Sequence, residues 1–275
     1  MKKIIQKSTL SLIAFSMILS LAGCADNTDS TVSAGQYTAS AETATATAQA
    51  TSNAISAKDD LKITGGTYNI TASDSAFDVN DLIAISDGDI TINATNDGLH
   101  CEYNDDDTVG EIYISGGTFN ITASDDAIHA QTIVTIDGGS FTINAAEGIE
   151  ATYVLINDGD ISITASDDGI NAASKSSAYT ATVEINGGDI TISMGSGDTD
   201  AVDANGNIYI NGGTIDITAN SAFDYDGTGE LNGGTVTVNG EQITELTNQM
   251  MGGSNKNRQA GGPIGGQAGG GNGGL

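Results

Sequence analysis

The chain has 275 residues, of which 36 are acidic and 8 are basic, and its formal net charge at pH 7 is −28. A surface this negative repels nucleic acids and anionic lipid headgroups, and it favours metal cations and cationic partners. We therefore expect no nucleic-acid partner, and an anionic substrate would need a bridging cation. The chain also contains 37 glycines, one proline and no tryptophan, so turns are frequent and the aromatic side chains that often contact sugars are few.

The N-terminus is typical of a secretory signal. Lys2 and Lys3 precede the apolar run LSLIAFSMILSLAG, which is too short for a stable membrane span and ends at Cys24. The segment 21–24, Leu-Ala-Gly-Cys, resembles the lipobox of bacterial lipoproteins. This resemblance implies that residues 1–23 are removed as a signal peptide and that Cys24 carries lipid. The protein would then be extracellular and lipid-anchored to the bacterial cell surface, with this anchor as its contact with the membrane.

Composition divides the remaining chain into three parts. Residues 24–56 are rich in Ala, Thr and Ser and predict a disordered stalk. Residues 247–275 are so rich in glycine that we expect a disordered tail. The folded domain is therefore predicted over 57–246, and we expect a monomer. Cys101 is the one cysteine in this domain, which leaves no intrachain disulfide, and its repeat position predicts a buried, inert thiol.

A glycine turn recurs eight times through the predicted domain. The spacings between the second glycines of successive turns are 22, 29, 22, 20, 29, 25 and 21 residues. A base period near 21 with insertions is typical of a solenoid. The repeated positions are Gly66, Gly88, Gly117, Gly139, Gly159, Gly188, Gly213 and Gly234.

The pattern within each repeat predicts three short strands. Apolar residues alternate with polar ones on both sides of the glycine turn, and a third apolar segment follows the pattern A-x-x-D-[A/G]-φ-x-A, where φ is apolar. We therefore predict an all-β fold, a single-stranded right-handed parallel β-helix of about eight rungs. Leucine-rich repeats and β-propeller blades do not fit the spacing. The inward positions after the glycine turn are Ile70, Ile92, Ile121, Ile143, Ile163, Ile192, Ile217 and Val238.

Stacking of the rungs aligns acidic residues in columns. Equivalent residues of adjacent rungs lie about 4.8 Å apart, and two like charges at that distance repel by about 3.5 kcal/mol at an effective dielectric near 20. Oxygen ligands from adjacent rungs suit Ca²⁺, which we predict as the cofactor. Zinc is less favoured, because His100 and His129 share a column but most of their neighbours are carboxylates. The predicted calcium ligands are Asp97, Asp125, Asp126, Glu147, Glu150, Asp167, Asp168, Asp200 and Asp203. The alternative is that Asp and Asn are present only because they tolerate turn geometry.

Three insertions, residues 102–111, 173–181 and 193–200, border the acidic columns and are expected to wall a groove. We predict that a polysaccharide binds there. The predicted ligand-binding residues are Glu150, Asp203 and Asp224, which share calcium with the ligand, and Tyr103 and Tyr179, which stack on it.

The NGGTxxI and SDD[A/G]I repeats, together with the lipoprotein signal, stalk and glycine-rich tail, resemble a known family of bacterial surface proteins. It is the family of calcium-binding carbohydrate-binding domains whose right-handed β-helix is similar to that of polysaccharide (pectate) lyases. The resemblance covers about residues 60–246. It implies calcium-dependent binding of plant cell-wall polysaccharide, either cellulose or acidic pectin-type glycans.

Other functions stay open. A lyase acting on polygalacturonate needs a strong base, and Lys175 is the single candidate, since the domain has no arginine and the other lysines are Lys58 and Lys62. A binding module is favoured over such an enzyme. Exposed Thr and Asn pairs on the second strand of each repeat fit a flat face that contacts cellulose or ice. A structural or adhesion protein of the cell surface is the remaining alternative.

Overall fold

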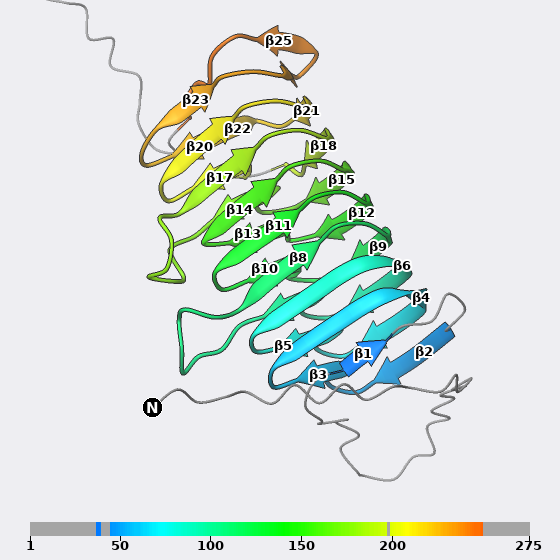
Figure 1. Ribbon diagram of the computed structural model, residues 1–275. Coiled ribbons are helices and arrows are strands. Elements are labelled where there is room, and N and C mark those ends of the chain that lie inside the picture. Colours follow the sequence, from blue (N-terminus) through cyan, green and yellow to red (C-terminus); the bar gives the residue numbers. More distant parts are fainter. Residues whose placement is uncertain (1–36, 40–44, 197–198, 250–275) are drawn as a thin grey trace, which may run out of the picture.

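The computed structural model describes residues 37–39, 45–196 and 199–249. Every regular element in these residues is a strand, and the strands wind into a parallel β-helix of about nine turns (Figure 1). The predicted all-β solenoid is therefore confirmed. The described residues contain no helix long and apolar enough to cross a membrane.

The strands form three faces, named here in the order in which the chain visits them. The first face contains β1 (Tyr37–Ala39), β8 (Glu111–Ile114), β11 (Ile133–Ile136), β14 (Tyr153–Ile156), β17 (Thr182–Ile185), β20 (Asn207–Ile210) and β23 (Gly229–Leu231). The second face contains β2 (Thr45–Ala50), β9 (Thr118–Thr122), β12 (Ser140–Ala145), β15 (Asp160–Ala165), β18 (Asp189–Met194), β21 (Thr214–Thr218) and β24 (Thr235–Val238). Two long strands, β4 (Asp60–Ala72) and β6 (Leu82–Ala94), continue across both of these faces.

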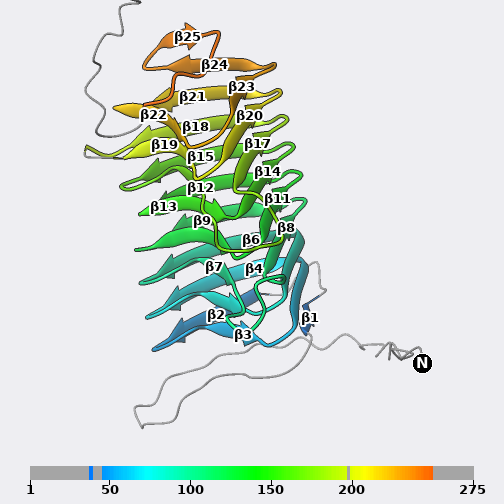
Figure 2. The same cartoon turned by 90° about the vertical axis from the view of Figure 1, so that its left-hand side faces the viewer.

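The third face is a sheet of eight strands, one from each of eight successive coils. Its strands are β3 (Ile55–Ala57), β5 (Phe77–Val79), β7 (Leu99–Cys101), β10 (Asp126–Ala130), β13 (Glu147–Ala151), β16 (Ile170–Ala172), β19 (Asp200–Ala204) and β22 (Ser221–Tyr225). The last coil ends in β25 (Glu241–Ile243), which pairs antiparallel with β24. The coils stack from the N-terminal to the C-terminal end (Figure 2).

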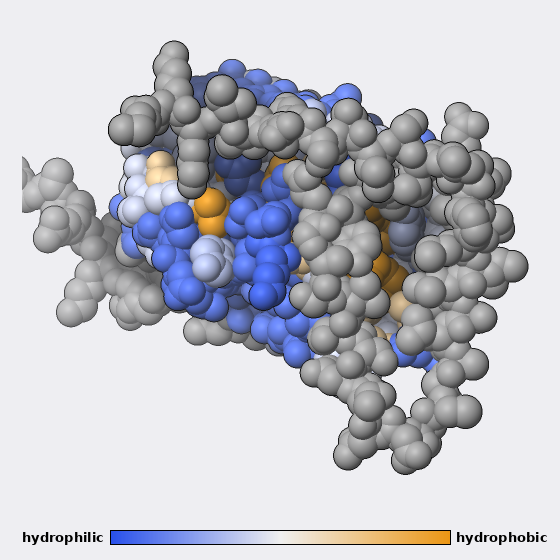
Figure 3. Space-filling view, turned by 60° about the horizontal axis from the view of Figure 1, so that its bottom comes forward, coloured by the Kyte–Doolittle hydropathy of each residue, from blue (hydrophilic) through white to orange (hydrophobic). Residues whose placement is uncertain are grey.

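The core follows from the strict register between coils. Ile143 pairs with Ile121 in the coil before it and with Ile163 in the coil after it, and all three side chains are at most 2% exposed. The rings of Phe119 and Phe141 stack in the same way, with centroids 4.6 Å apart. At the N-terminal end, hydrophobic residues are visible toward the interior and hydrophilic ones around them (Figure 3). Each coil therefore buries its inward residues against the same residue types in its neighbours.

The corner between the first and second faces explains the glycine repeat. All eight predicted turn glycines have positive φ, from +79° at Gly234 to +138° at Gly88. Residues with a Cβ rarely adopt these conformations, so glycine is the residue that turns the chain here. Cys101 also has its predicted place: it pairs with Val79 and Ala130 and is fully buried, and burial raises the pKa of its thiol.

The β-helix extends beyond the predicted N-terminal boundary at residue 57, whereas its last strand, β25, ends before residue 246. β1 and β2 pair with β4, and β3 pairs with β5, so residues of the predicted stalk form an additional N-terminal coil. The run TATAQA pairs in register with β4, and Ala48 lies opposite Ile70. At the C-terminal end, the backbone N–H of Gln249 donates to the carbonyl of Phe223. Residues 1–36 and 250–275, including the predicted signal peptide, Cys24 and most of the predicted tail, lie outside the described residues.

Two loops that come from different coils meet beside the third face. Residues 102–110 and 173–181 leave the stack on the same side (Figure 1). The Ser176 hydroxyl donates to the backbone carbonyl of Asp107, and the Ser177 N–H donates to the Asp107 carboxylate at 3.1 Å. The two insertions therefore contact each other across the intervening coils.

We predict that Gly148→Ala lowers the free energy of unfolding by about 1–3 kcal/mol, because it overpacks a tightly filled position. A Cβ at Gly148 would lie 2.3 Å from the Gly169 carbonyl oxygen and 2.7 Å from Cγ2 of Ile163. Urea denaturation followed by circular dichroism measures the change. Gly195→Ala is the matched control, since its Cβ would meet its nearest atom at 3.5 Å, and it should change stability by less than about 0.5 kcal/mol. Equal stability of the two variants would contradict the close approach of the coils at Gly148.

Candidate functional site

The third face carries the two polar columns that the repeats predict. Register pairs join Asp126 to Glu147 and Asp200 to Ser221, as expected for the turn column. The outer column lies three residues further along each strand. It contains Asp78, His100, His129, Glu150, Asn171, Asp203 and Asp224, each paired with the next. The sequence pattern therefore predicted correctly which side chains become neighbours.

The turn column has a structural role of its own. One carboxylate oxygen of Asp97 accepts the backbone N–H of Asp126 at 3.1 Å, and Asp168 accepts the backbone N–H of Asp200 at the same distance. Asp97 and Asp126 are at most 5% exposed. Part of the acidic pattern is thus explained by carboxylates that bind the backbone of the next coil at each corner.

His129 is the centre of a buried cluster in the N-terminal half of this face. Its Nδ1 lies 2.6 Å from Asp126 Oδ2 and 3.0 Å from Glu150 Oε2, and its Nε2 lies 3.2 Å from Glu102 Oε2. Burial alone would lower the pKa of His129, but its hydrogen bonds with Asp126, Glu102 and Glu150 raise it to about 11. The imidazole is therefore a cation, and each of its two ring nitrogens lies within hydrogen-bond distance of a carboxylate. We name this group, with His100 and Lys175, the histidine cluster.

Lys175 supplies the second cation of the histidine cluster. Its Nζ lies 2.8 Å from Glu150 Oε2, and its backbone N–H donates to the Thr152 hydroxyl at 3.1 Å. Burial would raise the pKa of Glu150, but the hydrogen bonds from His129 and Lys175 lower it. Glu150 is only 6% exposed. Two cations of the chain therefore already neutralise this predicted calcium ligand.

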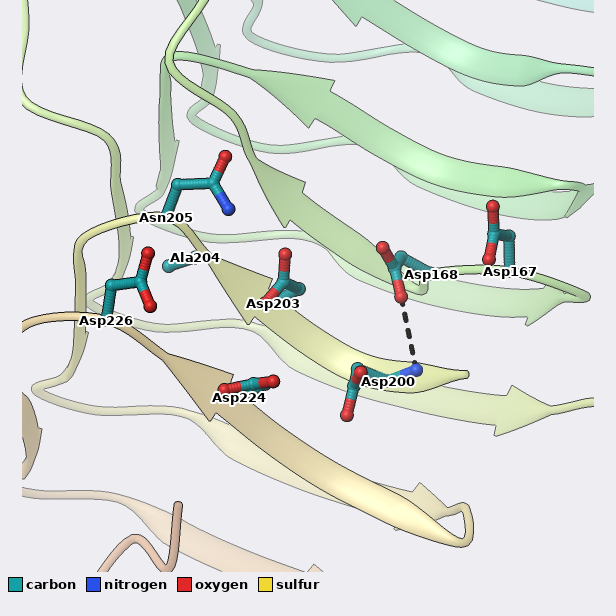
Figure 4. A pocket seen from close by; sticks show the side chains of 8 residues that line it. All are labelled: Asp167, Asp168, Asp200, Asp203, Ala204, Asn205, Asp224 and Asp226. Atoms are coloured by element: carbon teal, nitrogen blue, oxygen red, sulfur yellow. Dashed lines mark hydrogen bonds between the residues drawn. The ribbon is translucent and has the colours of Figure 1, made fainter. Parts of the chain in front are cut away.

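The C-terminal half of the third face is different. A pocket of about 320 Å³ opens there (Figure 4). It is lined by Asp167, Asp168, Asp200, Asp203, Ala204, Asn205, Asp224 and Asp226. These residues, the acidic pocket, include six aspartates and no lysine, arginine or histidine. Four of the predicted calcium ligands and the predicted ligand-binding residue Asp224 therefore meet in one hollow.

The carboxylates of the acidic pocket raise one another's pKa values. Burial, followed by the charges of Asp168, Asp224 and Asp200, raises the pKa of Asp203 to about 7. Burial, followed by the charges of Asp167 and Asp200, raises the pKa of Asp168 to about 6. A bound cation would offset this repulsion.

The arrangement of possible metal-ligand atoms differs between the two halves of the third face. Among the described residues, three ligand atoms lie within 4.8 Å of one another in two groups, His100–Glu102–His129 and Asp126–His129–Glu150. The carboxylates of the acidic pocket form no such group in this part of the chain, so an ion there would keep several water ligands. The buried amide oxygen of Asn171, in the outer column between Glu150 and Asp203, has no hydrogen-bond partner in the structure.

The remaining predicted residues lie at the margins of the face. Asp125 precedes the turn column, and Glu147 accepts a hydrogen bond from the Asn171 amide at 2.9 Å. Tyr103 lies in the first loop, where its backbone N–H donates to Gln131. Tyr179 is 40% exposed, but its ring packs edge-on against Tyr153 of the first face, at 5.6 Å between centroids. The acidic pocket contains no tyrosine.

Two kinds of site residue were missed by the sequence reasoning. Glu102 was assigned to an insertion, although it follows His100 by two residues and so lies on the same side of the chain. Asn205 and Asp226 come directly after strands β19 and β22, beyond the repeated pattern. Alignment of the residues that follow each third-face strand would have found all three.

Comparison with known proteins adds one match. Residues 43–199 and 147–265 match a family model described as "Carbohydrate-binding domain-containing protein". Together the two matches cover more than half of the chain and include the whole third face. No curated protein and no solved structure matches the chain.

We predict that the metal-free protein is more stable at pH 5.5 than at pH 8. The raised pKa values of Asp168, Asp203 and Glu147, the last at about 8, mean that folding favours their protonated forms. This stabilisation is complete below the ordinary pKa near 4 and is lost as the pH rises through 6 to 8. Glu150, whose pKa is lowered, is ionised in both states across this window and leaves the slope unchanged. The melting temperature in chelator should therefore fall by several degrees from pH 5.5 to pH 8.

Asp203→Asn should reduce this fall, because an amide does not ionise. Asp216→Asn is the matched control, since Asp216 is exposed on the second face, and it should keep the wild-type slope. A melting temperature that is constant or higher at pH 8 would contradict the raised pKa values of Asp168, Asp203 and Glu147.

Proposed function

We propose that this chain, which belongs to the family of carbohydrate-binding domain-containing proteins, binds acidic plant cell-wall polysaccharide of the pectin type through calcium in the acidic pocket. The observation that carries the proposal is the meeting of six aspartates in one hollow lined by no basic side chain. Carbohydrate binding itself rests on the family. The choice of an acidic glycan and of calcium rests on charge.

Calcium suits the chemistry of the pocket. Asp203 and Asp224 are register partners on adjacent strands, and such neighbours lie about 4.8 Å apart. Ca²⁺ takes six to eight oxygen ligands in flexible geometry, so carboxylates of adjacent coils are able to share it while water fills the other positions. Those water positions are available to the carboxylate and hydroxyl oxygens of a sugar.

An anionic polysaccharide needs such a bridge. The chain has a net charge of −28, and the acidic pocket concentrates that charge at one place. A uronate carboxylate is repelled by this surface unless a divalent cation lies between the two. We therefore propose that Asp203 and Asp224, which are register partners in adjacent coils, hold the shared calcium ion. Glu150 is left out, because Lys175 and His129 already neutralise it.

Neutral cellulose is a second candidate ligand, on a different face. The outward residues of the second face are exposed and polar, as in the register row Asn120, Thr142 and Ser162. These three residues offer hydroxyl and amide groups without charge, although the same row continues through Thr191 to Asp216. Binding of cellulose here would need no metal ion.

The protonation state of Lys175 favours a binding function over lyase chemistry. Burial would lower the pKa of Lys175, but the hydrogen bond and charge of Glu150 raise it instead. A lysine base must be neutral to take a proton from the sugar. The one candidate base is thus held in its protonated form by its neighbour, and we propose that the polysaccharide is bound without being cleaved.

We further propose that the domain is extracellular and attached to the bacterial cell surface through lipid on Cys24. The support is the motif Leu-Ala-Gly-Cys at 21–24 after an apolar run. Metabolic labelling with a fatty-acid analogue should mark the wild-type chain and leave Cys24→Ala unlabelled and released from the membrane. Equal labelling of both chains would contradict the anchor.

The central prediction is that binding to polygalacturonate depends on calcium and on the acidic pocket. In a pull-down, binding should disappear in chelator and return with Ca²⁺ more strongly than with Mg²⁺, which keeps its water ligands. The double variant Asp203→Asn, Asp224→Asn should weaken it at least about tenfold, in line with loss of direct metal ligands.

The matched control is Asp189→Asn, Asp216→Asn, which removes the same charge from exposed positions of the second face. It should bind polygalacturonate as the wild type does. Binding to cellulose, if the second face provides it, should be unaffected by chelator or by the pocket variant. Binding to neither polymer in either condition would contradict the proposed ligands.

A further inference from the structure

The two histidines of the described residues lie side by side on the third face, in adjacent coils. His100 of β7 and His129 of β10 are register partners, and their ring centroids are 4.9 Å apart. Glu102 leaves the end of β7 and directs its carboxylate between them. Glu102 Oε2 lies 3.2 Å from His129 Nε2 and 3.7 Å from His100 Nε2. Two imidazole nitrogens and one carboxylate oxygen therefore converge on one point.

The separations fit a transition-metal ion. Zinc binds histidine nitrogen and carboxylate oxygen at about 2.0–2.2 Å with tetrahedral geometry, so two of its ligand atoms lie about 3.3–3.5 Å apart. The two distances measured at Glu102 lie within a few tenths of an ångström of this value. All three ligand atoms lie within 4.8 Å of one another. Small rotations of the two partly exposed side chains, His100 and Glu102, would close the set around one ion.

The outer nitrogens of both histidines have carboxylate partners. His100 Nδ1 lies 3.2 Å from Asp78 Oδ1, and His129 Nδ1 lies 2.6 Å from Asp126 Oδ2. Asp78 is itself held by the side-chain amide of Asn53 at 2.6 Å. Metal-binding histidines usually donate their second ring N–H to a carboxylate, which sets the tautomer and aims the other nitrogen at the ion. Here the same arrangement occurs twice, with both Nε2 atoms on the side of Glu102.

We infer that His100, His129 and Glu102 form a site for a divalent transition-metal ion of the zinc class, separate from the acidic pocket. Nitrogen donors favour zinc over calcium, which takes oxygen ligands. When the ion binds, the proton on His129 Nε2 leaves to solvent, and the ion replaces it between His129 and Glu102. Three protein ligands leave a fourth position for water or for an oxygen of a ligand.

The solvent exposure of these three residues and their distance from the acidic pocket also fit a separate metal site. The side chains of His100 and Glu102 are 24% and 27% exposed, so an ion is able to enter from solvent, whereas His129 is 8% exposed and anchors the set. The other group of three ligands, Asp126–His129–Glu150, already has the ammonium of Lys175 2.8 Å from Glu150. Three coil steps of about 4.8 Å each separate His129 from Asp203, about 14 Å in all. The site does not depend on the proposed calcium function.

Isothermal titration of the chelator-treated, untagged chain with ZnCl₂, in an excess of CaCl₂ that occupies carboxylate sites, tests the inference. We expect one Zn²⁺ to bind per chain in the presence of calcium. Titration with Co²⁺ should give the visible absorption of a tetrahedral ion with nitrogen ligands. His100→Ala and Glu102→Gln should each weaken Zn²⁺ binding at least about tenfold and remove the Co²⁺ spectrum.

Two controls separate this site from nonspecific binding and from the calcium function. Glu111→Gln removes an exposed glutamate of β8, outside the cluster, and should leave Zn²⁺ binding unchanged. The pocket variant Asp203→Asn, Asp224→Asn should lose calcium-dependent polysaccharide binding and still bind Zn²⁺. Circular dichroism confirms that each variant is folded. Absence of Zn²⁺ binding in excess calcium would overturn the inference, and so would binding that survives both His100→Ala and Glu102→Gln or is lost in the pocket variant.

Discussion

The one-to-one register between coils is the constraint from which the other features of this protein follow. Each residue lies about 4.8 Å from its equivalent in the next coil, so every position in the repeat becomes a column. For inward isoleucines such as Ile121 and Ile143, this is favourable, because identical side chains pack on one another. For outward carboxylates it is unfavourable, with a repulsion of about 3.5 kcal/mol per adjacent pair at an effective dielectric near 20.

The third face offsets that repulsion in two ways. In its N-terminal half, His129 and Lys175 lie among the carboxylates, and they lower the pKa of Glu150 in spite of its burial. In its C-terminal half no basic side chain lines the acidic pocket, and the pKa of Asp203 rises to about 7. The first half has basic side chains of the chain among its carboxylates, whereas the acidic pocket in the second half is lined by none. This difference directs the proposed calcium function to one end of the face.

How far the sequence predicts these features depends on whether a residue belongs to the repeat. The isoleucine columns, the turn glycines and the neighbours within the acidic columns all follow from the period, and the structure confirms them. The N-terminal coil was missed, because TATAQA has neither isoleucine nor a glycine turn. Glu102 was not expected as a site residue, and Lys175 was expected beside the acidic columns but without its contact to Glu150. Their positions depend on the paths of two loops, and a period carries no information about a loop.

The two loops contribute Glu102 and Lys175 to the histidine cluster in the N-terminal half of the third face. Glu102 begins the first loop and Lys175 belongs to the second, and the contacts of Asp107 with Ser176 and Ser177 join the loops. Glu102 lies beside both histidines, and Lys175 lies beside Glu150. None of the residues that line the acidic pocket belongs to these two loops. Basic side chains of the chain therefore lie among the carboxylates at one end of the third face, whereas the acidic pocket at the other end has none in its lining, and this is the end that suits a ligand which must bring or share its cation.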